Sequence, residues 1–238
     1  MNTPTEPSHA EATRPTVVLV HGAFADSTSW NGVIARLRQD GYQVVAAANP
    51  LRALHSDAEF LRAVLGSVHG PLVVAGHSYG GSVTSEAADG NPAVKALVYI
   101  ASFLLDEGES TAELAGRFPG AELGPALHPV DVTTVDGETA ADLYIEQDKF
   151  PAVFAADVPP HVASLMAVTQ RPILGGALEE KATRAAWKSI PSWTMVTRQD
   201  VAIPAASQRF IAERAGSSTV EIDASMPSPS RSPMPSPT

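Results

Sequence analysis

Six short apolar runs recur along the chain, and their spacing constrains the fold more than any other feature of the sequence. Each run is rich in β-branched residues and lacks the strict polar alternation of a strand that faces water on one side. The runs occupy residues 16–20, 43–47, 72–75, 96–100, 193–196 and 219–222. They predict six strands buried on both faces of one sheet.

Helical patterns separate these runs. They cover residues 30–39, 57–68, 81–89 and 205–215. In the second pattern, Ser56 and Glu59 have the spacing of a capping box, and the apolar side chains share one face. Because strand and helix alternate, we predict an α/β fold with a mainly parallel six-stranded sheet and helices on both faces.

One interval of about ninety residues interrupts this alternation and is too long for a simple connection. It holds helix-like pieces at residues 111–118, 139–150, 161–169 and 179–188. We therefore expect a helical cap at residues 104–190, inserted between two parts of one core, residues 15–103 and 191–225. Disorder is expected at residues 1–14 and in the Pro/Ser-rich tail, residues 226–238.

Composition and charge exclude several functional classes. The chain has no cysteine, which excludes disulfides, a thiolate nucleophile and zinc–thiolate sites. Its net charge of −10 disfavours nucleic-acid binding, and it lacks an apolar run long enough to span a membrane. The start of the chain does not resemble a secretory signal, so a cytoplasmic protein is expected. No His/Asp/Glu cluster has metal-ligand spacing, so we expect neither metal nor cofactor.

A catalytic serine is predicted in the turn Gly76-His77-Ser78-Tyr79-Gly80. An apolar run enters this turn and a helical pattern leaves it, which is the strand–turn–helix setting in which a serine side chain is lifted above a sheet. Ser78 would then lie at a helix N-terminus. There the partial positive charge and the Tyr79 N–H can stabilise an oxyanion.

A second oxyanion donor is expected in the segment His21-Gly22-Ala23-Phe24, which follows the first strand. Ligands bind at the carboxyl edge of a parallel sheet, and this segment ends there. The N–H of Ala23 is the first choice and that of Phe24 the second. The alternative is that His21-Gly22 is only a tight turn.

The stretches at residues 21–30 and 76–81, read with the cap, resemble the small capped esterases of the α/β-hydrolase superfamily, a group that includes bacterial carboxylesterases and plant methylesterases and hydroxynitrile lyases. The resemblance implies that Asp200, after the fifth run, is the triad acid. Its role would be to hold a histidine in the correct tautomer. Alternatively, Asp200 is only a helix N-cap.

The resemblance also implies a triad histidine after the last strand, but Met226 occupies that position. The final helix of the group is missing too. No histidine follows His161, which with His128 lies in the expected cap. We expect the side chain of His77 to point into the fold and His21 to support the oxyanion turn, and the other histidines, His9, His55 and His69, to be surface residues.

A single-base deletion near the codon for Ser225 accounts for both losses. Methionine is encoded by ATG and proline by CCN. If a C precedes the codons of Met-Pro-Ser-Pro and the frame starts one base earlier, the sequence reads CAT-GCC-NTC-NCC and begins with histidine and alanine. With the GC-rich codons that twelve arginines against four lysines suggest, the tail becomes His-Ala-Val-Ala-Val-Ser-Gln-Pro-Asp-Ala-Val-Ala-Asp. We interpret the Pro/Ser-rich tail as the product of this frameshift, and the alternative is a natural Pro/Ser tail.

These observations favour a serine hydrolase of small carboxylic esters that is impaired by the loss of its histidine. Two alternatives stay open: a hydroxynitrile-lyase-like enzyme, and a catalytically dead ligand-binding protein. The expected partner is a small-molecule ester, with neither nucleic acid nor membrane, and the expected oligomeric state is a monomer or a homodimer.

Overall fold

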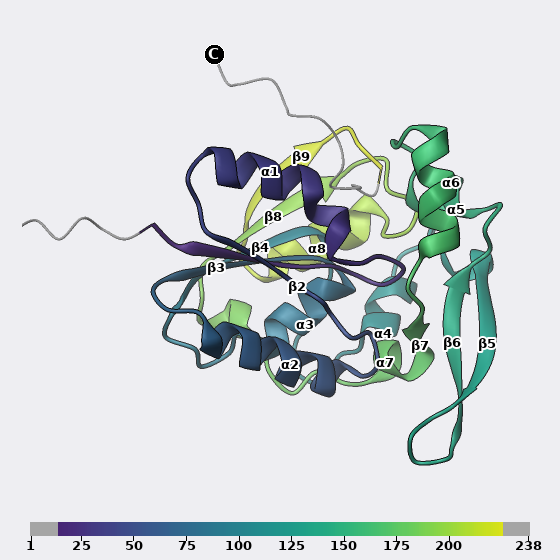
Figure 1. The fold of residues 1–238 in the computed structure, drawn as a ribbon, viewed down its shortest axis with the longest axis horizontal. Helices are drawn as coiled ribbons and strands as arrows, with labels where there is room; N and C mark the ends of the chain where they lie inside the picture. The colour runs from purple at the N-terminus through teal and green to yellow at the C-terminus, as the bar shows by residue number, and fades with distance from the viewer. Residues whose placement is uncertain (1–13, 226–238) are drawn as a thin grey trace, which may run out of the picture.

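The structure is a computed structural model that describes residues 14–225, so the expected tail lies outside the described residues. Its main sheet has six parallel strands in the order β2-β1-β3-β4-β8-β9 (Figure 1). Their bounds are β1 Thr16–Val20, β2 Val44–Ala47, β3 Leu72–Ser78, β4 Val94–Ser102, β8 Ser192–Thr197 and β9 Ser218–Ile222. All six predicted strands are confirmed.

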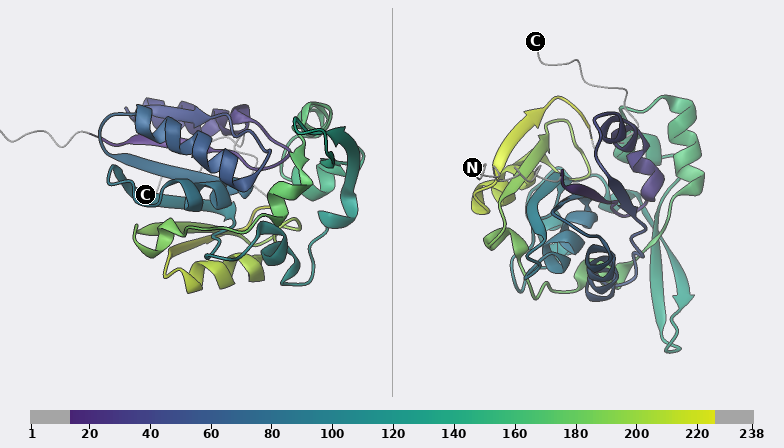
Figure 2. Two further views of the ribbon diagram at one scale, coloured as in Figure 1. Left: turned by 90° about the horizontal axis from the view of Figure 1, so that it is seen from below. Right: turned by 60° about the vertical axis from the view of Figure 1, so that its left-hand side comes forward.

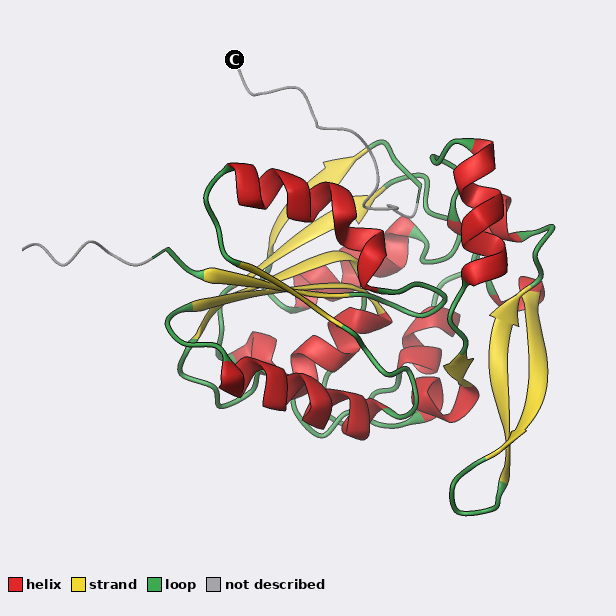
Figure 3. Ribbon diagram, viewed as in Figure 1, coloured by secondary structure: helices red, strands yellow, loops and turns green. Residues whose placement is uncertain are grey.

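Helices cover the two faces of the sheet unequally (Figure 3). Helix α1 (Asn31–Gln39), with the 3-10 turn η1 (Ser27–Trp30) before it, packs on one face in a small apolar cluster around Trp30. Helices α2 (Leu54–Ser67), α3 (Tyr79–Ala87) and α8 (Ala205–Arg214) share the larger cluster on the opposite face. The predicted fold class is therefore confirmed, with most of the core on one side.

The start of α2 differs from the prediction. The helix begins at Leu54, and the Ser56 hydroxyl donates to the carbonyl of Ala53, 3.2 Å away, from inside the first turn. The expected capping box at Ser56 and Glu59 is therefore wrong. A capping box does occur at Ser110 and Glu113, where α4 (Thr111–Gly116) begins.

The insertion, which we define as residues 103–191 between β4 and β8, is only partly helical (Figure 2). It holds an antiparallel sheet of β5 (Leu127–Thr133), β6 (Thr139–Ile145) and β7 (Ile173–Leu174). The helix predicted at residues 139–150 is wrong, because most of it is β6. The sequence signal for this hairpin is Asp136-Gly137, where Gly137 takes φ 83° and Thr134 N–H donates to the Glu138 carbonyl, 2.9 Å away.

The helices of the insertion agree with the prediction at two places. Helix α4 lies within residues 111–118, and α6 (Pro160–Thr169) matches residues 161–169. Between residues 179 and 188 the prediction is wrong, because α7 (Gly175–Glu179) ends at 179 and only the turn η3 (Ala186–Lys188) follows. Two short elements, α5 (Phe150–Phe154) and η2 (Gly124–Ala126), complete the insertion. No described helix is long and apolar enough to cross a membrane.

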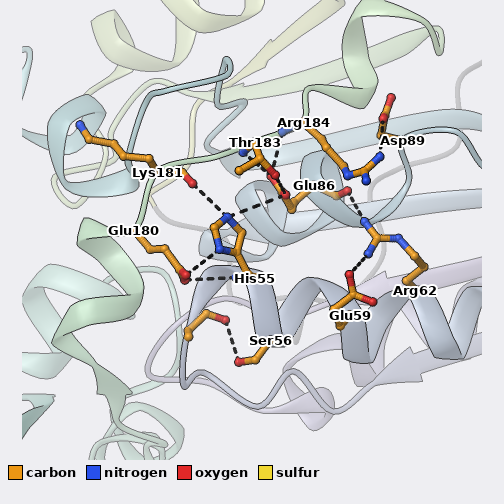
Figure 4. A network of polar contacts seen from close by, with 11 residues as sticks. His55, Ser56, Glu59, Arg62, Glu86, Asp89, Glu180, Lys181, Thr183 and Arg184 are labelled. Carbon is orange, nitrogen blue, oxygen red and sulfur yellow. Dashed lines mark hydrogen bonds and ion pairs between the residues drawn. The ribbon is translucent and has the colours of Figure 1, made fainter.

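A buried carboxylate fixes the returning end of the insertion to the core (Figure 4). Glu86, in α3, is 2% exposed and accepts hydrogen bonds from the backbone N–H groups of Thr183 and Arg184 at 2.9 and 3.1 Å, and from the Thr183 hydroxyl. Beside it, His55 of α2 pairs with Glu180 at 2.7 Å. The insertion is thus held to α2 and α3, the same helices that support the serine turn.

Candidate active site

Ser78 lies where the sequence predicts, at the junction of β3 and α3. Its backbone has φ 52° and ψ −128°, a conformation that residues with a Cβ seldom adopt. The neighbouring glycines make the turn possible: a Cβ on Gly76 would lie 2.7 Å from the carbonyl oxygen of Gly80, and a Cβ on Gly80 would lie 2.7 Å from that of His21. The turn is therefore strained, and it lies directly against the end of β1.

The segment after β1 packs against this serine. A Cβ on Gly22 would lie 2.7 Å from the Ser78 Cβ, so only glycine fits there without displacing the turn. Ala23 and Phe24 follow, both buried, and Phe24 has φ 60°. Both predicted oxyanion segments thus lie at the carboxyl edge of adjacent strands, β1 and β3.

Asp200 follows β8 at the same edge of the sheet, and β4 alone separates β8 from β3. Its carboxylate is 5% exposed. One oxygen accepts the N–H groups of Ala202 and Ile203 at 2.8 and 2.9 Å, and the other accepts the Thr197 hydroxyl at 3.1 Å and the Gln208 amide at 3.2 Å. An incoming imidazole N–H would have to share the second oxygen.

Burial raises the pKa of the Asp200 carboxyl to about 6, although these hydrogen bonds favour the ionised form. The alternative role as a helix cap is also partly visible. Asp200 caps the turn at Ala202 and Ile203, whereas α8 begins at Ala205 with Pro204 before it. The side chain therefore orders the loop without capping the helix itself.

The chain after β9 returns to the Asp200 loop. The N–H of Gln199 donates to the Ala224 carbonyl at 3.0 Å, and the N–H of Ser225 donates to the Asp157 carboxylate of the insertion at 2.7 Å. Met226, the position expected for the triad histidine, lies outside the described residues. Of the last two described residues, Ala224 is thus tied to the loop of the predicted acid and Ser225 to the insertion.

The buried histidines are placed as predicted. The His77 ring packs edge-on against Trp30, with centroids 6.4 Å apart, on the α1 side of the sheet. Burial lowers its pKa to about 4. The Nδ1 atom of His21 lies 2.9 Å from the Gly22 carbonyl oxygen, and burial lowers the pKa of this ring as well. Both rings are therefore neutral at pH 7.

The remaining histidines lie away from these groups or outside the described chain. His69, His128 and His161 are exposed. His55 was expected at the surface, but it is half-buried against Glu180. His9 lies outside the described residues. Within residues 14–225, no group of three metal-ligating side chains comes together.

Sequence reasoning missed several residues that contact the site. After β2, Asn49 contacts His21 and Asp57 contacts Tyr79, while the Arg52 N–H donates to Asp57. The available signal was the position of Asn49-Pro50 at the end of a predicted strand, where a parallel sheet places its functional loops. The Asp157 contact had no local signal, because it depends on how the insertion folds.

Comparison with known proteins bears on the family and the fold of this chain. Residues 17–232 match the model of a family described as "Alpha/beta hydrolase family". The alpha/beta hydrolase nvfD of Aspergillus novofumigatus is 26% identical over 223 residues, which cover 84% of each chain. A carbendazim-hydrolysing esterase of Nocardioides sp. is 31% identical over 110 residues, 41% of this chain and 46% of that one. The crystal structure of polyneuridine aldehyde esterase superposes with a TM-score of 0.78 and 18% sequence identity, covering 90% of this chain and 92% of that one. At this identity the likeness shows only that the two proteins share a fold.

Proposed function

We propose that this chain, which belongs to the alpha/beta hydrolase family, is a serine esterase for small carboxylic esters whose triad histidine has been lost. The observation that carries the proposal is the Ser78 turn, with φ 52° between β3 and α3 and with Gly22 in contact. A strained serine with a helix N-terminus behind it is the arrangement that acyl transfer requires. Hydrolase and esterase names among the relatives support the same reaction class.

The reaction proceeds through an acyl-enzyme. The Ser78 oxygen attacks the ester carbonyl while a histidine takes the serine proton, and the N–H groups of Ala23 and Tyr79 hold the oxyanion. Phe24 is the second choice for the first donor. The alcohol leaves with the proton from the imidazolium, and water then cleaves the acyl-serine bond by the reverse steps. Asp200 orients the histidine and stabilises its charged form.

The base of this mechanism is missing from the chain as it stands. Met226 cannot accept a proton, and the neutral buried rings of His21 and His77 already have structural positions. Removing the histidine base of a serine hydrolase such as subtilisin lowers the turnover rate by about 10⁶-fold. We therefore infer that the parent chain has little or no activity and that the frame-restored tail supplies the histidine.

The test compares four proteins in the hydrolysis of p-nitrophenyl butyrate. They are the parent chain, its Ser78→Ala variant, a restored-tail variant whose residues from 226 on are His-Ala-Val-Ala-Val-Ser-Gln-Pro-Asp-Ala-Val-Ala-Asp, and that variant with Ser78→Ala. We expect turnover only in the restored-tail protein with Ser78 present. Equal Ser78-dependent turnover in the parent would overturn the account of Met226, and turnover without Ser78 would overturn the esterase site.

The substrate panel follows from the relatives. Short p-nitrophenyl esters and methyl esters test the general class, and carbendazim is included because the relative from Nocardioides sp. is named for its hydrolysis. A mandelonitrile assay for cyanide release tests the lyase alternative. We disfavour a lyase, because the lyase branch that this chain resembles usually carries threonine after the first histidine and lysine beside the catalytic histidine, whereas this chain has Gly22 and no such lysine.

A second candidate function is ligand binding without turnover, and Met226 is the observation that favours it. In this case the parent chain would bind a small ester tightly, and Ser78→Ala would leave the affinity unchanged. Isothermal titration with a non-hydrolysable ester analogue measures this directly. Weak binding by the parent together with turnover by the restored-tail variant excludes this function.

A further inference from the structure

The loop that follows β2, residues 49–52, is linked to both segments that carry the proposed oxyanion donors, directly to His21 and through Asp57 to Tyr79. We call it the bracing loop. At its start, Asn49 is 2% exposed, and its amide Nδ2 donates to the His21 carbonyl at 3.0 Å. His21 lies two residues before Ala23, so this hydrogen bond holds the strand end that presents the first donor.

The other end of the bracing loop holds the second donor through Asp57. The Tyr79 hydroxyl donates to the Asp57 carboxylate at 2.9 Å, and the Arg52 N–H donates to the two oxygens of the same carboxylate at 3.1 and 3.2 Å. Asp57 is fully buried, and burial raises the pKa of both the Asp57 carboxyl and the Tyr79 phenol. A buried carboxylate depends on its few donors, so the position of Tyr79 is coupled to that of Arg52.

The insertion holds the bracing loop from the opposite side. The Arg52 guanidinium binds the carboxylate of Asp142 in β6 at 2.7 Å and the carbonyl of Pro172 at 2.8 Å. The Leu174 N–H donates to the Leu51 carbonyl at 3.0 Å. Leu51 is fully buried with φ 63°, a strained conformation that persists only where the surroundings fix it.

We propose that the bracing loop couples the seating of the insertion to the geometry of the oxyanion hole, with Asn49 and Arg52 as positioning residues. The inference rests on the proposed function, because the donors it positions are those of Ala23 and Tyr79. When Asp142 and Pro172 of the insertion bind the Arg52 guanidinium, Arg52 is fixed, and through Asp57 the Tyr79 N–H is fixed as well. The insertion therefore affects the geometry of the oxyanion hole through Arg52 and Asp57.

The kinetic test uses the restored-tail variant with Arg52→Ala. Coupling through such a network is worth about three- to thirty-fold, so we expect kcat to fall within that range. KM should stay within about twofold, because oxyanion donors act mainly in the transition state. Arg52→Lys keeps the positive charge, but an ammonium group cannot bind both Asp142 and the Pro172 carbonyl as the planar guanidinium does. This variant should therefore recover only part of kcat. Arg36→Ala removes an exposed ion pair with Asp40 on α1 and serves as the matched control.

A second measurement does not depend on activity. Amide hydrogen exchange in the parent chain should become faster at residues 21–23 and at Tyr79 in Arg52→Ala and in Arg52→Lys, and should be unchanged there in Arg36→Ala. Unchanged exchange at these amides in both Arg52 variants would overturn the coupling, as would a kcat equal to that of the Arg36 control. If the restored-tail variant shows no Ser78-dependent turnover, the proposed function fails while the exchange data still decide the coupling.

Discussion

The backbone N–H of Ser225 donates to the carboxylate of Asp157 at 2.7 Å, so the insertion holds the residue just before position 226, where the triad histidine is expected. Ser225 is 7% exposed, and its neighbour Ala224 accepts the N–H of Gln199. Residues 224 and 225 are thereby held between the predicted acid loop and the insertion. We therefore expect Asp157 to position the residue that follows Ser225.

We predict that Asp157→Ala lowers kcat of the restored-tail variant by about 10- to 100-fold, because a misplaced catalytic group loses that much rate. Asp157→Asn keeps an acceptor for the Ser225 N–H and should lose much less. Steady-state hydrolysis of p-nitrophenyl butyrate measures both. Asp148→Ala, at an exposed position of the same insertion, is the control, and an equal loss in that variant would refute the prediction.

Gly22→Ala should destabilise the protein by about 1–3 kcal/mol, the usual cost of forcing a methyl group into a packed site. The added Cβ would meet the Ser78 Cβ at 2.7 Å and the His77 carbonyl at 2.9 Å. Urea unfolding measures the change. Gly66→Ala is the matched control, because its Cβ meets no atom within 4 Å near the end of α2, and it should stabilise by about 0.5–1 kcal/mol. Similar effects from both substitutions would contradict the packing argument.

The Asp200 carboxyl should make stability fall as pH rises. Its folded pKa of about 6 exceeds its ordinary value of 3.8, so the folded state binds the extra proton between these values. This contribution to the free energy of unfolding is fully present below about pH 4 and is lost by about pH 6, a change of about 3 kcal/mol.

Denaturant titrations of the parent and of Asp200→Asn across pH 4–7 isolate the Asp200 contribution. The buried rings of His21 and His77 act in the opposite direction, since their lowered pKa values make stability fall as pH decreases. Only the difference between the two proteins is therefore diagnostic. A difference that does not vary with pH would show that Asp200 titrates normally.

One part of the main sheet should cause self-association. Helix α1 covers one face of the sheet over β1 and β3. On the same face, β8 and β9 leave two apolar side chains exposed, Trp193 by 46% and Val220 by 56%. Val220→Lys should reduce light scattering of the parent at high concentration. Val135→Lys, at a fully exposed isolated valine, should leave the scattering unchanged. In the restored-tail variant, a shift of tryptophan fluorescence to shorter wavelength would report that the new residues cover Trp193.

The strands and the Ser78 turn were predictable because their signals are local. An apolar run followed by Gly76-His77-Ser78-Tyr79-Gly80 specifies strand, turn and helix within a few residues. The helix predicted over the β6 segment is wrong because the apolar residues there also fit a helical period, whereas the Asp136-Gly137 turn selects the hairpin. The start of α2 was misplaced because the Ser56 hydroxyl bonds within the first turn.

The supporting contacts of the candidate site were not predictable in the same way. Arg52 meets Asp142 across 90 positions of sequence, and Ser225 meets Asp157 across 68. No periodicity or spacing encodes such pairs, because they arise only once the insertion is in place. The residues proposed to carry the chemistry were therefore identifiable, whereas those that position them were not.

The position of the insertion also affects how the sheet forms. Leu97 of β4 is in register with Ser192 of β8, so this pairing must close a loop of about ninety residues before it contributes any stability. Strands β1 to β4 and the serine turn can form before this loop closes. Strands β8 and β9, with the Asp200 loop between them, join the sheet only after the loop has closed. We therefore expect the acid to be recruited late in folding, and local opening of β8 and β9 to separate it from a serine turn that stays intact.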